Sequence, residues 1–229
     1  MKSNRVDPRF DDLAYTVRRY YVDEFYFRHV PSLFGRVLDL SGKKVGKRGQ
    51  FDISRYPHLM VTYVNLEPAT RPNVCCDAAA LPLAGNSFNA VICSELLEHV
   101  PDPKEVLNEA HRVLRPNGKL LLCVPFLFPI HADPYDYGRY TDHYWREALG
   151  QIGFVNTQIE CQGLFWSVLI DFLKEYAAKA RVSPPTRWML KHAVALGQRW
   201  AFWTESRLSR SNSPFLRRFT TGFGIVCQK

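Results

Sequence analysis

The chain has 229 residues, 46% of them hydrophobic, which is enough for one domain with a substantial core. No stretch approaches the roughly 18 uninterrupted apolar residues that a membrane span needs. The polar N-terminus, residues 1–12, contains no apolar signal core, so we expect no secretory signal and a cytoplasmic protein.

The net charge of +8 is unevenly distributed along the chain. Residues 1–164 carry 19 Lys or Arg and 19 Asp or Glu, whereas residues 165–229 carry 11 Lys or Arg and only 3 acids. This asymmetry predicts an anionic partner at one end of the molecule.

Cysteine usage gives a prediction about redox chemistry and metals. Six cysteines lie within apolar runs, with no CxxC pair and no Cys/His metal spacing: Cys75, Cys76, Cys93, Cys123, Cys161 and Cys227. We therefore expect free thiols in a reducing compartment, no disulfide and no metal site.

The elements expected in the first half alternate between strand and helix. A helix rich in aromatic residues is expected over 11–29, where Pro31 ends it. Four short apolar strands are expected at residues 37–40, 59–66, 73–76 and 89–93. The segment between the first two strands has glycines and a proline without helical periodicity, so this crossover is expected to be a loop or a very short helix. A capped helix is expected to begin at Asp102 and to run to residue 114.

The second half adds a strand over 120–124, a helix over 141–151, and strands over 154–161 and 221–227. This alternation predicts an α/β protein with a mostly parallel sheet and helices on both faces. We divide it into an N-terminal helical cap (1–35), a core (36–163), a basic helical insertion between the last two strands (164–219), and a final strand (220–229).

Polar or acidic residues end each of the first four strands: Asp39, Glu67, Asp77 and the pair Ser94 and Glu95. Ligands of open α/β sheets bind at the carboxyl ends of the strands. An acid at the end of the second strand can accept hydrogen bonds from ribose hydroxyls, and Glu67 has that position. The competing interpretation is that each acid only caps a turn.

These residues belong to a longer pattern that resembles the class I S-adenosylmethionine-dependent methyltransferases. The resemblance rests on VLDLSG, on CCDAAALPLAGNSFNAVICSELLEHVPDPKEVLNEAHRVLRPNGKLLLCVP and on the final GFGIVCQK, and it covers about residues 36–154 plus the last strand. It is greatest for the ubiquinone and menaquinone biosynthesis methyltransferases. It implies a Rossmann-like, doubly wound, seven-stranded sheet, mostly parallel with an antiparallel last strand.

The resemblance also implies which residues hold S-adenosylmethionine. Asp39 would lie near the methionine amino group, and the backbone of Ser41 and Gly42 would pass under the ribose and methionine. Glu67 would accept from the ribose hydroxyls. The remaining residues would hold the adenine edge and line the methionine side: Asp77 and Ala78, then Ser94 and Glu95.

The first loop departs from the family's DxGxGxG pattern, because Ser41 and Lys43 replace two glycines. A dinucleotide loop needs close approach to a pyrophosphate, whereas S-adenosylmethionine has no phosphate and carries a positive sulfonium. The loop is therefore compatible with this cofactor and poor for NAD. Weakened binding or a lost activity stays open as an alternative.

The acceptor side is expected in the polar and aromatic segment after the strand at 120–124. His131 is the candidate general base, Asp133 the residue that orients it, and Tyr137 a third catalytic candidate. The alternative for His131 is a hydrogen bond within its own loop. No N-P-P-[YFW] motif follows the fourth strand, which favours an oxygen or carbon acceptor over an amino group.

The insertion begins with a helix whose apolar and charged residues fall on opposite sides. One side has Phe165, Val168, Leu169, Phe172, Leu173, Tyr176 and Ala180, and the other has Asp171, Lys174, Glu175 and Lys179. A second helix over 187–203 adds tryptophans and basic residues. This composition favours peripheral contact with a membrane surface through 164–219 or a lipid-linked anionic acceptor. The alternative is a helical lid with its apolar side on the sheet, and nucleic acid is less favoured.

The sequence thus predicts a methyltransferase that uses S-adenosylmethionine on oxygen, or on carbon, of a small-molecule, glycan or lipid-linked acceptor. The first alternative is a catalytically silent methyltransferase-like module that binds a membrane or partner. The second is an RNA methyltransferase. The oligomeric state is left open.

Overall fold

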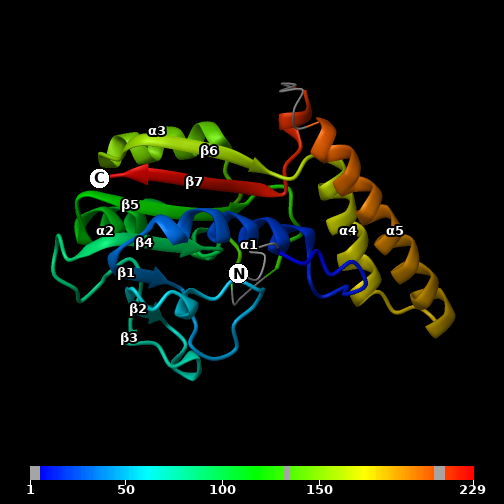
Figure 1. Cartoon of the computed structure of the whole chain (residues 1–229), viewed down its shortest axis with the longest axis horizontal. Coiled ribbons are helices and arrows are strands. Elements are labelled where there is room, and N and C mark those ends of the chain that lie inside the picture. The colour runs from blue at the N-terminus through cyan, green and yellow to red at the C-terminus, as the bar shows by residue number, and fades with distance from the viewer. Residues whose placement is uncertain (1–5, 132–134, 209–214) are drawn as a thin grey trace.

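A computed structural model of the chain describes residues 6–131, 135–208 and 215–229. A seven-stranded sheet with strand order β3-β2-β1-β4-β5-β7-β6 forms its centre (Figure 1). The strands are β1 (Gly35–Leu40), β2 (Leu59–Asn65), β3 (Val74–Cys75), β4 (Phe88–Ser94), β5 (Leu114–Pro125), β6 (Val155–Gln162) and β7 (Gly222–Gln228). Only β7 is antiparallel to its neighbours, so the predicted sheet is confirmed.

Helices cover both faces of this sheet. The helix α1 (Val17–His29) packs on one face through Val22, Phe25 and Tyr26. On the other face lie α2 (Pro103–Val113) and α3 (Asp142–Ile152), whose buried side chains join the larger core. The helices α4 (Phe165–Lys179) and α5 (Pro184–Leu208) lie between β6 and β7 in the chain and project from one end of the sheet (Figure 1).

Two elements begin well away from the sequence-based expectation. The first helix begins at Val17 rather than near residue 11, because Thr16 caps it and its hydroxyl accepts from the Arg19 amide. The fifth strand begins at Leu114, so the turn at residues 115–118 is contained within it rather than preceding it. At this turn Asn117 has a positive φ of 63°.

The crossover from β1 to β2 is a loop with one short 3₁₀ turn, η2 (Ile53–Arg55), as predicted. The carboxylate of Asp23 on α1 holds this loop by accepting from the Gln50 amide at 2.7 Å and the Phe51 amide at 3.2 Å. The loop side chains Phe51 and Tyr56 then pack against the core under α1. Aromatic packing and one buried carboxylate therefore replace the missing crossover helix.

We call α4 and α5 together the helical hairpin. A lid would pack its apolar side against the protein, but α4 packs its polar side inward. On α4 the charged Asp171 and Lys174 are buried, while five large apolar side chains are exposed: Phe165, Leu169, Phe172, Leu173 and Tyr176. On α5 the buried residues include Gln198 and Glu205, and the exposed ones are Trp188, Met189, Leu196, Trp200 and Trp203. The lid alternative is therefore wrong for α4. We call these ten exposed residues the outer face of the hairpin.

Buried polar groups explain why the hairpin packs this way round. Asp171 caps α1 by accepting from the amides of Val17 at 2.6 Å and Arg18 at 2.7 Å. Lys174 donates to the Tyr15 carbonyl at 2.7 Å and to Gln198 at 2.8 Å. These hydrogen bonds offset part of the cost of removing the two charges from water. Burial still raises the pKa of Asp171 to about 7 and lowers that of Lys174 to about 8.

Candidate functional site

A cleft of about 890 Å³ opens at the carboxyl ends of β1, β2 and β4, with α1 along one wall. All eight residues that the sequence predicts for cofactor binding line it: Asp39, Ser41, Gly42, Glu67, Asp77, Ala78, Ser94 and Glu95. They come from four separate strand ends, which the parallel register places at one edge of the sheet.

The loop after β1 keeps a tight turn although it lacks two of the family's glycines. Ser41 takes a left-handed φ of 67°, and its hydroxyl donates to the Ser94 carbonyl at 3.0 Å. The side-chain amide of Asn65 donates to the backbone carbonyls of Ser41 at 2.9 Å and Gly42 at 3.3 Å. The sequence analysis did not identify Asn65 as a site residue. The only sequence feature that points to it is its position as a polar residue at the end of an apolar strand.

Gly42 is required by close packing rather than by its own backbone angle. A Cβ atom at this position would lie 2.4 Å from the carboxyl carbon of Asp39 and 2.7 Å from the Tyr63 ring. Burial raises the pKa of Asp39 to about 7, and the charge of Lys47 opposes this rise. The end of β1 therefore presents a carboxylate that a cationic ligand would stabilise.

Glu67 and Asp77 each cap a turn, and each also lines the cleft. Each carboxylate uses one oxygen to cap a turn: Glu67 accepts from the Ala69 amide at 3.1 Å and Asp77 from the Ala79 amide at 2.9 Å. Both residues also line the cleft. A capping role and a ligand-binding role are thus compatible at both positions.

Glu95 forms a buried ion pair with Arg18 of α1, which the sequence gave no reason to expect. The guanidinium donates to both carboxylate oxygens, at 2.6 and 3.4 Å. Burial opposes ionisation, but the charge and hydrogen bonds of Arg18 outweigh it and hold the pKa of Glu95 below its usual value. Arg18 also donates to Gln162, at the end of β6.

At the far end of the cleft lie His99, His131 and Tyr135, with the buried Glu98 behind the two imidazoles. Burial, followed by the nearby charge of Glu95, raises the pKa of Glu98 to about 8. His99 lies on the 3₁₀ turn η4 (Leu97–His99) and lines the cleft.

The three catalytic candidates have different outcomes. His131 lines the cleft as expected. Tyr137 is half exposed. Among the residues that the structure describes, it is not one of those that line the cleft. Asp133 lies outside the described residues, and Asp136 is the acid that accepts from the His131 amide, at 2.9 Å. Asp136 also forms an ion pair with Arg139.

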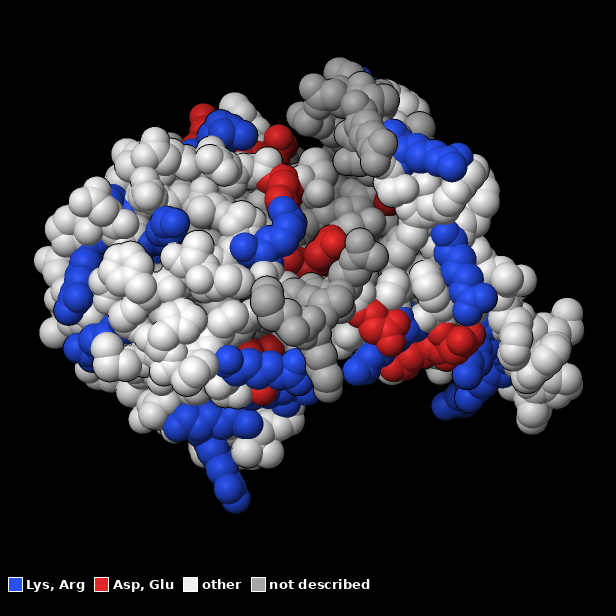
Figure 2. Space-filling view, viewed as in Figure 1, with Lys and Arg blue, Asp and Glu red and all other residues white. Residues whose placement is uncertain are grey.

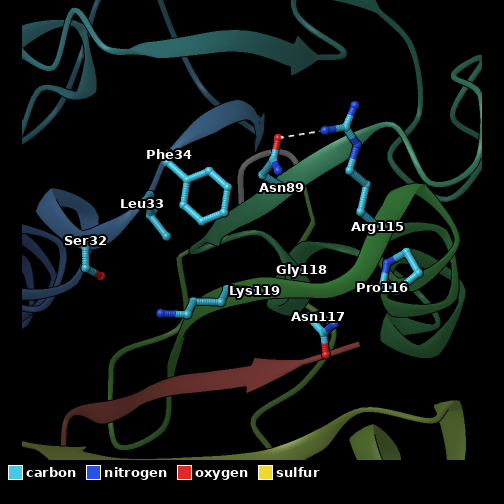
Figure 3. Close-up of a pocket in the computed structure, with 9 residues that line it drawn as sticks. All are labelled: Ser32, Leu33, Phe34, Asn89, Arg115, Pro116, Asn117, Gly118 and Lys119. Atoms are coloured by element: carbon cyan, nitrogen blue, oxygen red, sulfur yellow. Dashed lines mark hydrogen bonds between the residues drawn. The ribbon is translucent and has the colours of Figure 1, made fainter.

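A smaller hollow of about 140 Å³ lies at the other end of the strands, where β1, β4 and β5 begin (Figure 3). Asn89 lies at its rim, where its side-chain oxygen accepts from the Arg36 amide at 3.0 Å and from the Arg115 guanidinium at 3.4 Å. These bonds close the start of β1 against the turn in β5. The hollow is distant from the carboxylate-lined cleft, and its polar groups have structural roles.

Comparison with known proteins gives matches to methyltransferases. A family model described as a methyltransferase domain matches residues 50–122. The malonyl-[acyl-carrier protein] O-methyltransferase of Alcanivorax borkumensis is 32% identical over 165 residues, which is 66% of this chain and 49% of that protein. The ubiquinone/menaquinone biosynthesis C-methyltransferase of Roseobacter denitrificans is 50% identical over 46 residues, 20% of this chain and 18% of that protein.

Among solved structures, an S-adenosylmethionine-dependent methyltransferase from Archaeoglobus fulgidus matches with a TM-score of 0.57 and 17% identity. That match covers 92% of this chain and 94% of the other. It establishes the fold. The matched segments span about half, or less, of the length of the two curated relatives described above.

Proposed function

Because the chain belongs to the class I S-adenosylmethionine-dependent methyltransferases, we propose that it transfers the cofactor's methyl group to an oxygen atom of a small-molecule, glycan or lipid-linked acceptor. One observation carries this proposal: carboxylates from four strand ends line a single cleft. A carbon acceptor is a variant of the same proposal, because the relatives that match this chain include an O-methyltransferase and a C-methyltransferase.

The residues of the cleft fit this cofactor. Asp39 is a buried carboxylate whose burial disfavours its charge, so a bound ammonium or sulfonium would compensate for that cost. Glu67 keeps a second carboxylate oxygen beyond the one that caps its turn, and that oxygen can accept from ribose hydroxyls. When bound, S-adenosylmethionine supplies an activated methyl group, and the protein's task is mainly to position the acceptor in line with it.

The acceptor end of the cleft supplies a proton acceptor. Methylation of a hydroxyl forms an O–C bond, breaks the sulfonium S–C bond and releases the hydroxyl proton. His131 fits the role of receiving it, because the nearest partner of its Nδ1 is the Pro129 carbonyl at 3.1 Å, nearer than the Arg139 guanidinium at 3.4 Å, and this favours Nε2 as the nitrogen that accepts a proton. Asp136 and Arg139 hold the His131 loop in place.

We also propose that the outer face of the helical hairpin lies on a membrane with anionic headgroups. Eleven of the nineteen large hydrophobic side chains that are exposed among the described residues belong to residues 165–215. Two of the three acids in residues 165–229, Asp171 and Glu205, are buried, so the hairpin surface keeps an excess of basic charge. On the face in Figure 2, blue Lys and Arg atoms lie along the projecting helices among white side chains, with red acidic atoms beside them on the side toward the sheet.

Apolar side chains flanked by basic ones suit the interface of an anionic bilayer, and the charge makes this surface complementary to it. No helix in the described part of the chain is long and apolar enough to cross a membrane, so the contact would be peripheral. Such a contact would bring the cleft close to a lipid-linked acceptor. An RNA acceptor is less supported, because the tryptophans share their face with leucines rather than lining a basic groove.

Two measurements test the proposal. Calorimetric titration with S-adenosylhomocysteine should give binding, and its absence at high micromolar ligand would favour the silent binding module instead. The protein should then be incubated with methyl-labelled cofactor and separate cell fractions. We expect label in the lipid extract or in the small-molecule fraction, and label in RNA alone would reject the proposed acceptor class.

A further inference from the structure

Three ligand atoms of metal-binding type converge at the acceptor end of the cleft. They are a carboxylate oxygen of Glu98 and one ring nitrogen each of His99 and His131, all within 4.8 Å of one another. The Glu98 oxygen Oε1 lies 3.6 Å from Nε2 of His99 and 4.0 Å from Nε2 of His131. The two histidines are 32 positions apart in the sequence, so no local spacing reveals the cluster.

The hydrogen bonds of the two imidazoles determine which nitrogen faces Glu98. Nδ1 of His99 lies 2.6 Å from the Tyr135 carbonyl, and Nδ1 of His131 lies 3.1 Å from the Pro129 carbonyl. A carbonyl only accepts, which favours the proton on each Nδ1 and a lone pair on each Nε2. Nδ1 of His131 also lies 3.4 Å from the guanidinium of Arg139, which only donates, but the Pro129 carbonyl is the nearer partner. Histidines that bind metals commonly donate their other ring N–H to a backbone carbonyl, a carboxylate or a water, which fixes the orientation of the ring.

The cluster therefore consists of acceptors that face one another. Both carboxylate oxygens of Glu98 are buried without a hydrogen-bond partner, and the residue is 2% exposed. The nearest cations are already engaged, Arg18 with Glu95 and Arg139 with Asp136. An ionised carboxylate buried beside two imidazole lone pairs needs a positive charge close to it, which either a proton on Glu98 or a metal ion bound between the three groups can supply.

We propose that Glu98, His99 and His131 bind a divalent transition-metal ion of the zinc class. Two imidazoles with one carboxylate form a known catalytic zinc set, whereas Mg²⁺ prefers oxygen ligands alone. Metal–ligand bonds of about 2.0–2.2 Å place ligand atoms roughly 3.5 Å apart, close to the separations between Glu98 and each histidine. Glu98 forms the buried side of the cluster, and the two histidines form the side that is accessible from the cleft.

The role of this ion rests on the proposed function. An open coordination position at the acceptor end would bind the acceptor hydroxyl and lower its pKa, so that the oxygen attacks as an alkoxide. His131 would then act as a metal ligand, and the released proton would leave to solvent rather than to this ring. The sequence-based expectation of no metal considered only Cys and His spacing, which cannot detect three residues joined by the fold.

Metal binding can be measured without cofactor or acceptor. The full-length protein, freed of metal by a chelator and dialysed, is titrated with Co²⁺ while its visible absorption is followed, and with Zn²⁺ and Mg²⁺ by calorimetry. We expect one Co²⁺ or Zn²⁺ per chain and far weaker binding of Mg²⁺. The isosteric Glu98→Gln and the truncation His131→Ala should each weaken Zn²⁺ binding at least about 100-fold.

His143→Ala is the matched control, because His143 is an exposed histidine of α3. It should leave Zn²⁺ affinity unchanged, and thermal unfolding should establish that each variant is folded. Absence of Co²⁺ and Zn²⁺ binding by the folded wild-type protein overturns the proposal, as does equal Zn²⁺ affinity in the folded Glu98→Gln protein. Methyl transfer that persists without any bound metal also overturns it while leaving the proposed function intact.

Discussion

The membrane proposal predicts that three leucines on the outer face of the hairpin contribute to binding. Leu169 and Leu173 of α4 and Leu196 of α5 are 38%, 40% and 64% exposed, so each has surface that a bilayer can cover. The triple substitution of these leucines by Gln removes apolar surface while keeping a residue of similar helix propensity. We expect the variant to fold normally and to bind anionic vesicles more weakly.

The size of the effect follows from the exposed area. Together the three exposed fractions amount to roughly one and a half leucine side chains. Complete burial of one leucine is worth about 2 kcal/mol, so insertion of the three would contribute about 3 kcal/mol. The triple variant should therefore bind anionic vesicles up to about 100-fold more weakly.

Co-sedimentation with vesicles rich in phosphatidylglycerol, compared with pure phosphatidylcholine, measures this binding. The wild-type protein should bind the anionic vesicles at about 50 mM salt and lose most binding at about 0.5 M, because salt screens the basic residues. The control variant combines Met60→Gln with Val155→Gln, which change exposed apolar residues of β2 and β6 outside the hairpin. Equal binding by wild type and triple variant, or equal loss in the control, would refute the reasoning.

Three further predictions concern the cofactor cleft. Since burial raises the pKa of Asp39 to about 7, this group is protonated below that pH, so S-adenosylhomocysteine affinity should fall as pH drops from 8 to 6. Calorimetry of Asp39→Asn should show weaker binding with a flat pH profile, and a wild-type profile in this variant would contradict the assignment. Glu67→Gln keeps the acceptor that caps the turn but removes the charge, so we expect about tenfold weaker binding with an unchanged melting temperature. Gly42→Ala places a methyl group 2.4 Å from the Asp39 carboxyl carbon, so it should abolish binding, and retained affinity would show that the loop rearranges freely.

The sheet and the cofactor side of the cleft were predictable because their signals are local. Each strand is an apolar run of a few residues, and the residue that follows it is where parallel strands place ligand contacts. Asp39, Glu67 and Asp77 can therefore be located from their own segments alone. The resemblance to known methyltransferases then supplied a role for each.

The rest of the site depends on contacts between distant segments. Arg18 and Glu95 are 77 positions apart, and nothing near Arg18 distinguishes it from the exposed arginines of the chain. Glu98 reads as an ordinary acid beside a histidine until the fold brings His131 to it. Burial raises the pKa of Glu98, whereas the pairing with Arg18 lowers the pKa of Glu95, and sequence position alone reveals neither effect.

The orientation of the hairpin was left open by the sequence for a different reason. An amphipathic helix has an apolar and a polar side, and the pattern alone does not say which one packs on the rest of the protein. Here the polar side packs inward because Asp171 and Lys174 find partners in the N-terminal segment. The alternative of an apolar side packed inward therefore fails for α4, whose buried charged groups are hydrogen-bonded.

This inverted packing connects the hairpin to the cleft. Asp171 of α4 accepts from the backbone amide of Arg18, and the side chain of that same Arg18 forms the ion pair with Glu95 in the cleft. A helix that packed its apolar side inward would offer no carboxylate to cap α1, and Arg18 would lose the anchor that fixes its backbone beside β4. The reversed helix therefore does two things at once: it supports a charged wall of the site, and it leaves apolar side chains outward for a surface on which the acceptor is anchored.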